Sequence, residues 1–105
     1  MTGCLTHVAQ VDGRTLVRIT GELDVSTAPR LEEMLALFDG KIVVDCSRLE
    51  FIDRAGLEVF AAAAREHEGL TFRHAPPMLS RLVQLADLED VLRFDDSTPD
   101  EPSPV

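Results

Sequence analysis

The sequence predicts a single α/β domain, in which a small, mixed and mostly parallel sheet is flanked by helices. The chain has 105 residues, which is enough for one hydrophobic core. Two β-rich runs surround Asp12-Gly13, a strong signal for a two-residue hairpin. Helical and strand-like patterns then alternate as far as residue 94. The resulting order, ββαβαβαβ, favours parallel strands joined by right-handed crossovers, and we expect the domain to cover residues 1–94.

The hairpin occupies residues 5–23 in this prediction. In its second strand Val17 and Ile19 alternate with Arg18 and Thr20. Because side chains alternate between the two faces of a sheet, one face is expected to be buried and the other partly wet.

The first helix follows this hairpin. Ser26 or Thr27 can cap it, and Pro29 falls in the first turn, where backbone amides have no partner within the helix. Apolar residues at i, i+3, i+4 and i+7 form one stripe, which consists of Leu31, Met34, Leu35 and Phe38. Asp39-Gly40 is expected to end the helix.

The second half of the domain begins with residues 41–46, KIVVDC, an apolar run typical of a central strand covered on both faces. Asp53 is placed to cap the next helix, which Glu68-Gly69 ends. The stripe of this helix is Leu57, Phe60, Ala61 and Ala64. The run of alanines from 61 to 64 indicates a close approach to a neighbouring element.

The last elements are a strand over residues 70–74, a helix opened by Pro76-Pro77 and a short strand over residues 91–94. The stripe of this third helix consists of Leu79, Leu82, Val83 and Ala86.

The charge of the chain is acidic, with a net value of −9. Residues 95–105 carry four acids, three prolines and no base, so we expect a disordered acidic tail. The body then has about −5 (−9 minus −4) and scattered arginines, which argues against nucleic-acid binding. No run is long and apolar enough to cross or insert into a bilayer, and no signal peptide is recognisable, so a cytoplasmic location is expected.

Motifs for catalysis, cofactors and metals are not found. The sequence has no GxxxxGK[ST], GxGxxG, HExxH or GxSxG. His7, His67 and His74 are expected as surface or strand-edge side chains, without ligand spacing. Cys4 and Cys46 are expected as reduced thiols, with Cys46 packed as a small hydrophobe. We therefore expect no enzyme activity, no cofactor and no metal.

Two aspartates follow predicted strands. Asp24 ends the second strand, and Asp53 ends the stretch after the third. Functional groups of parallel sheets gather beyond the carboxyl ends of strands and at helix N-termini. Each aspartate is therefore expected as a helix cap, as a functional group, or as both.

Three segments resemble the STAS domain of bacterial anti-sigma-factor antagonists: GELDVSTAPRLEEML, KIVVDCSRLEFID and AGLEVF. The resemblance runs in order from about Leu5 to Phe94 and implies the small mixed sheet with helices predicted above. It also implies a non-catalytic partner switch, in which the unmodified domain binds an anti-sigma factor that is often a serine kinase. Phosphorylation at the start of the second helix breaks that complex, because the added charge of about −1.5 to −2 disrupts the interface.

The sequence departs from the family pattern at the phosphoacceptor. The family has Asp, then Ser or Thr at one or both of the next two positions, then Gly-Leu. Asp53, Gly56 and Leu57 match, but Arg54 and Ala55 stand where the acceptor is expected. The resemblance therefore implies a switch and partner-binding surface formed by Asp24, Ser26, Thr27, Asp53, Arg54, Ala55, Gly56 and Leu57. Ser26, Thr27 and Ser47 are the nearest alternative acceptors, and structural roles are favoured for all three.

Other functions are compatible with the sequence. A STAS domain can resemble a regulatory subunit of an ABC-type lipid transport complex, which binds the transporter ATPase. A small ligand near Asp24 and Asp53 is a further alternative. A receiver-like role for Asp45 is disfavoured, because the chain lacks the acidic pair and the lysine near the last strand that such chemistry needs.

Overall fold

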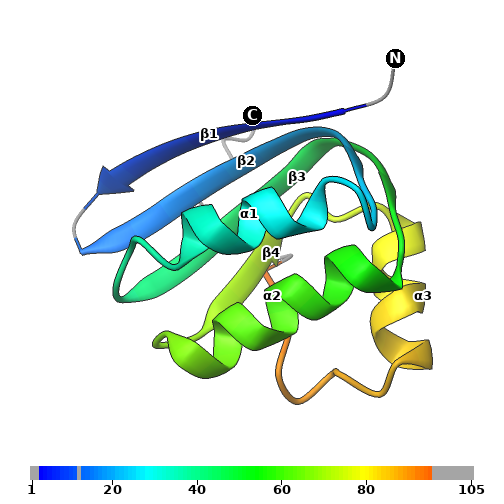
Figure 1. Cartoon of the computed structure of the whole chain (residues 1–105). Helices are drawn as coiled ribbons and strands as arrows, with labels where there is room; N and C mark the ends of the chain where they lie inside the picture. Colours follow the sequence, from blue (N-terminus) through cyan, green and yellow to red (C-terminus); the bar gives the residue numbers. More distant parts are fainter. Residues whose placement is uncertain (1–2, 12, 96–105) are drawn as a thin grey trace, which may run out of the picture.

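The computed structural model describes residues 3–11 and 13–95. The elements of this range confirm the predicted order ββαβαβαβ (Figure 1). They are β1 (Cys4–Val11), β2 (Arg14–Leu23), α1 (Ala28–Leu35), β3 (Lys41–Ile52), α2 (Arg54–Glu66), β4 (Leu70–Arg73), α3 (Pro77–Leu85) and β5 (Arg93–Phe94). The predicted tail lies outside the described residues except for Asp95. No helix within the described residues is long and apolar enough to cross a membrane.

The strands form one mixed sheet, as the sequence predicted, and their order in the sheet is β1-β2-β3-β4-β5. The β1–β2 pair is antiparallel and the other three pairs are parallel. Val11 pairs with Arg14, which leaves the two-residue connection expected of the hairpin. Gly13 has φ +78°, a conformation that glycine adopts without steric cost, while Asp12 lies outside the described residues.

The helices cover one face of this sheet. Figure 1 shows α1 and α2 on the same side, and the buried side chains of strands and helices form a single cluster there. Along β3, Ile42 and Val44 are buried on this face, whereas Val43 and Asp45 on the other face are only half-buried. The prediction that β3 is covered on both faces was therefore wrong. A continuous apolar run shows no alternation, so it cannot distinguish one covered face from two.

β3 is also twice as long as predicted, because it continues from Cys46 to Ile52. The pairing of β3 with β2 shifts its register twice. Arg18 pairs with Asp45 but Thr20 pairs with Arg48, so β3 has one extra residue between these pairs. It has a second extra residue before Phe51. Extra residues of this kind are β-bulges, which bend a strand and redirect its side chains. In this segment burial recurs every third residue, at Cys46, Leu49 and Ile52. An alternation of apolar and polar residues, which has a period of two, therefore does not predict this part of β3.

The helix contacts confirm the interpretation of the alanine run. Ala63 is buried, and α1 packs directly against α2. His67 follows α2 and is half-buried, not a surface side chain as predicted. Its Nδ1 lies 2.9 Å from the Ala63 carbonyl oxygen and its Nε2 lies 2.6 Å from that of Phe38, so it ties the end of α2 to the segment after α1.

The end of α2 that faces the strand termini depends on a close approach at Gly56. A Cβ atom there would lie 2.8 Å from both Cγ and the carbonyl oxygen of Leu23, and 3.1 Å from Cγ1 of Ile52. Since one of these atoms belongs to the β2 backbone, the helix cannot accept a larger residue without moving. Glycine at this position therefore fixes the first turn of α2 against the ends of β2 and β3.

We predict that Gly56→Ala lowers the free energy of unfolding by about 1–2 kcal/mol, because the overpacking cost exceeds the helix-propensity gain of alanine. The measurement is the urea midpoint at unchanged m-value. Gly3→Ala is the matched control, since a Cβ at Gly3 meets nothing within 4 Å. Equal stability of Gly56→Ala and the parent protein would contradict this view of the packing.

Candidate functional site

The candidate site lies where β2 and β3 end. Leu23 and Ile52 form the last pair between these strands, and the Asp53 amide donates to the Leu23 carbonyl oxygen at 3.2 Å. The turn before α1 (residues 24–27) and the start of α2 (residues 53–57) therefore begin side by side. This arrangement brings together the two segments that the sequence singled out.

The turn before α1 is organised by Asp24. Its carboxylate accepts hydrogen bonds from the Ser26 hydroxyl at 2.7 Å and from the amides of Ser26 and Thr27 at 3.0 and 3.2 Å. Thr27 occupies the N-cap position of α1, but its side chain does not cap the helix. Its hydroxyl accepts from the Asp24 amide and donates to the Glu22 carbonyl oxygen. The prediction that Ser26 or Thr27 caps α1 was therefore wrong, because both hydroxyls hold the preceding turn.

These bonds change the acidity of Asp24. Hydrogen bonds from the Ser26 side chain, then from the amides of Ser26 and Thr27, lower the pKa of Asp24 below the ordinary value for aspartate. The carboxylate therefore stays charged beside the Ser26 hydroxyl. A phosphate on Ser26 would meet this charge at hydrogen-bond distance, which disfavours Ser26 as an acceptor.

Asp53 caps α2 as predicted. Its carboxylate accepts from the Gly56 amide at 3.1 Å, and its backbone is extended. Gly56 and Leu57 follow, and both are buried, with Leu57 fully so. These two residues lie beneath the surface, where they position the helix start.

Arg54 and Ala55 form the accessible part of the helix start. The Arg54 side chain is 68% exposed, and its Nε lies 3.2 Å from Oε2 of Glu58 one turn later. Both side chains of this ion pair are exposed, so the pair adds little stability. In addition, the positive charge of Arg54 at a helix N-terminus interacts unfavourably with the helix dipole. Arg54 can therefore exchange Glu58 for another carboxylate at small cost. Ala55 is half-buried.

Two exposed apolar residues adjoin the site, and neither was predicted from the sequence as part of it. Val25 is 72% exposed within the Asp24 turn, and Phe51 is 43% exposed near the end of β3. Val25 stands between turn-forming residues, a local signal of exposure. Phe51 had no such signal, because it lies in the part of β3 that was not predicted as strand.

An apolar groove of about 470 Å³ borders the site. Ile52, which directly precedes Asp53, lines one side of the groove, and α3 supplies Met78, Leu82 and Leu85 together with Pro77 and Arg81. Leu85 is 76% exposed. The surface beside the start of α2 is therefore apolar and includes the basic residue Arg81.

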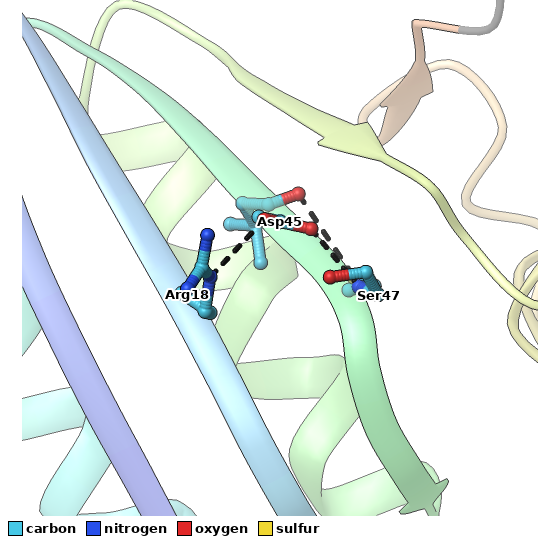
Figure 2. A network of polar contacts seen from close by, with 5 residues as sticks. Arg18, Asp45 and Ser47 are labelled. Carbon is cyan, nitrogen blue, oxygen red and sulfur yellow. Dashed lines mark hydrogen bonds and ion pairs between the residues drawn. The ribbon is translucent and has the colours of Figure 1, made fainter.

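Ser47 lies apart from this surface. It lies five positions before Ile52 along β3, about 16 Å of strand. Figure 2 shows it beside Asp45 and Arg18, and its amide donates to Asp45 at 3.0 Å, while Arg18 Nε lies 3.3 Å from Asp45 Oδ2. Partial burial by itself would raise the pKa of Asp45, but the bonds from Ser47 and Arg18 lower it below its ordinary value. The Asp45 network is thus a local structure on the open face of the sheet.

The two cysteines differ in environment. Cys46 is 2% exposed within the core, and its burial raises the pKa of its thiol to about 12. Cys4 is half-buried, and burial also raises the pKa of its thiol. Across residues 3–11 and 13–95, no three His, Cys, Asp or Glu side chains are grouped so that they could hold a metal ion.

Comparisons with known proteins cover nearly the whole folded range. A family model described as "Mlab, STAS domain" matches residues 6–93. The anti-sigma-B factor antagonist of Staphylococcus aureus is 30% identical over 90 residues, which cover 78% of this chain and 83% of that protein.

Solved structures agree with this match. An anti-sigma factor antagonist from Mycobacterium paratuberculosis has a TM-score of 0.80 and 28% identity, with 93% of this chain and 90% of that chain covered. The unphosphorylated anti-sigma factor antagonist SpoIIAA has a TM-score of 0.72 over 92% of this chain and 93% of that chain. At 18% identity the second likeness concerns the fold alone.

We predict that Ser26→Ala raises the pKa of Asp24 toward its ordinary value, because the strongest of its hydrogen bonds is lost. Since the folded-state pKa is lowered, the stabilisation by this turn is complete above the pKa of the unfolded chain and is lost as pH falls through the folded-state value. A carboxyl NMR titration measures the change, with Val25→Ala as control. An unaltered pKa of Asp24 in Ser26→Ala would refute the assignment.

Proposed function

This chain belongs to the STAS-domain family and resembles the anti-sigma factor antagonists within it, and we propose that it is a non-catalytic module that binds an anti-sigma factor without a phosphorylation switch at the usual position. The observation that carries this proposal is the start of α2. The capping aspartate, the close-packed glycine and the buried leucine of the family pattern are in place, while Ala55 lacks a hydroxyl.

The physical basis of this proposal is that the surface at the start of α2 resembles the unmodified form of the family. A phosphate acts in such an interface by adding charge that repels the partner and costs desolvation. Alanine cannot receive that charge, and it is close in size to unmodified serine. Asp53 still holds the first turn through the Gly56 amide. The surface therefore keeps the shape of the unmodified, binding-competent form.

The composition of the surface indicates the chemistry of the partner. Val25, Phe51 and the groove beside α3 offer apolar area, and Arg54 is a cation held only by an exposed ion pair. A partner surface with apolar side chains and a carboxylate for Arg54 fits this composition. A partner adapted to a small hydroxylated residue at position 54 is excluded by the arginine, which gives selectivity among related anti-sigma factors.

A second candidate is a STAS subunit of an ABC-type lipid transport complex that binds the transporter ATPase. The observation that favours this candidate is the description of the matching family model, "Mlab, STAS domain", which does not mention anti-sigma factors. The same helix start would serve as the contact surface in this case.

We predict that the tagged natural protein captures an anti-sigma factor from its native cell, and that this complex survives incubation with Mg-ATP. In Ala55→Ser, and in Arg54→Ser, a kinase-type partner adds one phosphoryl group and the complex dissociates, because a charge now enters the interface. Mass spectrometry identifies the partner, and intact-mass measurement reports the phosphate.

The control is the double variant Ala55→Ser with Asp53→Ala, which has the acceptor but lacks the helix cap. Capture of a transporter ATPase instead would favour the second candidate. Stoichiometric phosphorylation of the natural protein, with release of the partner, would overturn the proposal of a missing switch.

A further inference from the structure

The outer edge of β1, which Figure 1 shows beyond β2, is a sheet edge without a paired strand among residues 3–11 and 13–95. β1 has eight residues and pairs with β2 without a register shift, whereas the opposite edge strand, β5, has only two residues. Within the part of the chain that the structure describes, no strand pairs with the other side of β1.

The edge lacks the features that normally protect such strands. Natural edges are blunted by lysine, proline, bulges, charged residues or short length. Cys4–Val11 contains none of these apart from His7, and Leu5 is 65% exposed. An edge of this length and composition favours pairing with a further strand.

The backbone groups of this edge follow from the hairpin. Gly3 accepts a hydrogen bond from the Glu22 amide, so Gly3 faces β2. Because pairs alternate in an antiparallel ladder, residues 5, 7 and 9 also face β2, and the outward groups belong to the even positions. These are Cys4, Thr6, Val8 and Gln10.

We propose that β1 pairs with β1 of a second copy of this chain, antiparallel and around a two-fold axis at His7. In this register Thr6 lies opposite Val8 of the other copy and Cys4 lies opposite Gln10, so all four outward residues find partners within β1. A shift by two residues in either direction leaves one of the four outside the strand. The strand is thus self-complementary in one register, as a closed two-fold contact requires.

The surroundings of the edge fit a second copy. β1 carries no acidic side chain, so the net charge of −9 is not concentrated at the axis. On the open face, Leu5 would lie opposite Ala9 of the other copy and bury apolar area. On the helix side, a groove of about 250 Å³ separates β1 from α1, with Thr6 and Leu31 among its lining residues. This groove leaves room for the side chains of an added strand.

The test is a site-directed disulfide in the full chain, in a Cys4→Ser background. At the axis, His7 of the two copies forms a non-hydrogen-bonded pair with Cα atoms about 4.5 Å apart, within the range that a disulfide spans. We expect His7→Cys to give a covalent dimer on treatment with diamide. Ala9→Cys is the matched control, because its two copies lie about 13 Å apart along the strands and should stay monomeric.

A second variant tests the backbone pairing. Thr6→Pro removes one outward amide and keeps the hydrogen bonds to β2, so we expect it to abolish the crosslink at His7→Cys while circular dichroism stays unchanged. Analytical ultracentrifugation of the unmodified protein should show a monomer–dimer equilibrium. A monomer at all concentrations, or equal crosslinking of His7→Cys and Ala9→Cys, would overturn the proposal.

Discussion

The contact on which the candidate site depends is the packing of the first turn of α2 against the last pair of β2 and β3. The Asp53 amide binds the Leu23 carbonyl oxygen, and Gly56 lies against Leu23 and Ile52 with no room for a Cβ atom. These contacts place the two helix-start segments next to each other. Buried Leu23 and Gly56 therefore position two exposed residues of the site, Val25 and Arg54.

The same arrangement explains how the site keeps its shape without a hydroxyl at positions 54 and 55. Asp53 caps α2 and Asp24 organises the adjacent turn through bonds within their own segments. Neither needs residue 54 or 55 for this role. Arginine and alanine can therefore occupy these positions while Asp53 and Asp24 still hold the backbone of the surface, as the proposed partner-binding surface without a charge switch requires.

Much of the fold was predictable because local signals agree with the tertiary structure. The two residues between Val11 and Arg14, the Asp53 cap and the apolar stripe with Leu57 and Phe60 all combine a local preference with burial. β3 beyond Cys46 was not predictable, because its bulges replace a period of two by a period of three. The covered face of β3 also escaped prediction, since Val43 is apolar on the open side.

The site was predictable in its position but not in its composition. Asp24 and Asp53 follow strands, and their proximity results from parallel pairing that the alternating order implies. The exposure of Phe51 depends on the extension of β3 beyond Cys46, and the ion pair of Arg54 with Glu58 depends on side-chain conformations; neither was predicted from the sequence. Because Gly56 and Leu57 are buried, they shape the surface but are not themselves exposed on it.

The proposed function requires that the helix-start surface binds an anti-sigma factor in its unmodified form. Amide NMR spectra of the isotope-labelled protein, recorded as the purified anti-sigma factor is added without ATP, test it directly. We predict that the largest shift changes fall on residues 24–27 and 51–55. Changes confined to β1 or to the Asp45 network, with both helix starts unaffected, would contradict it.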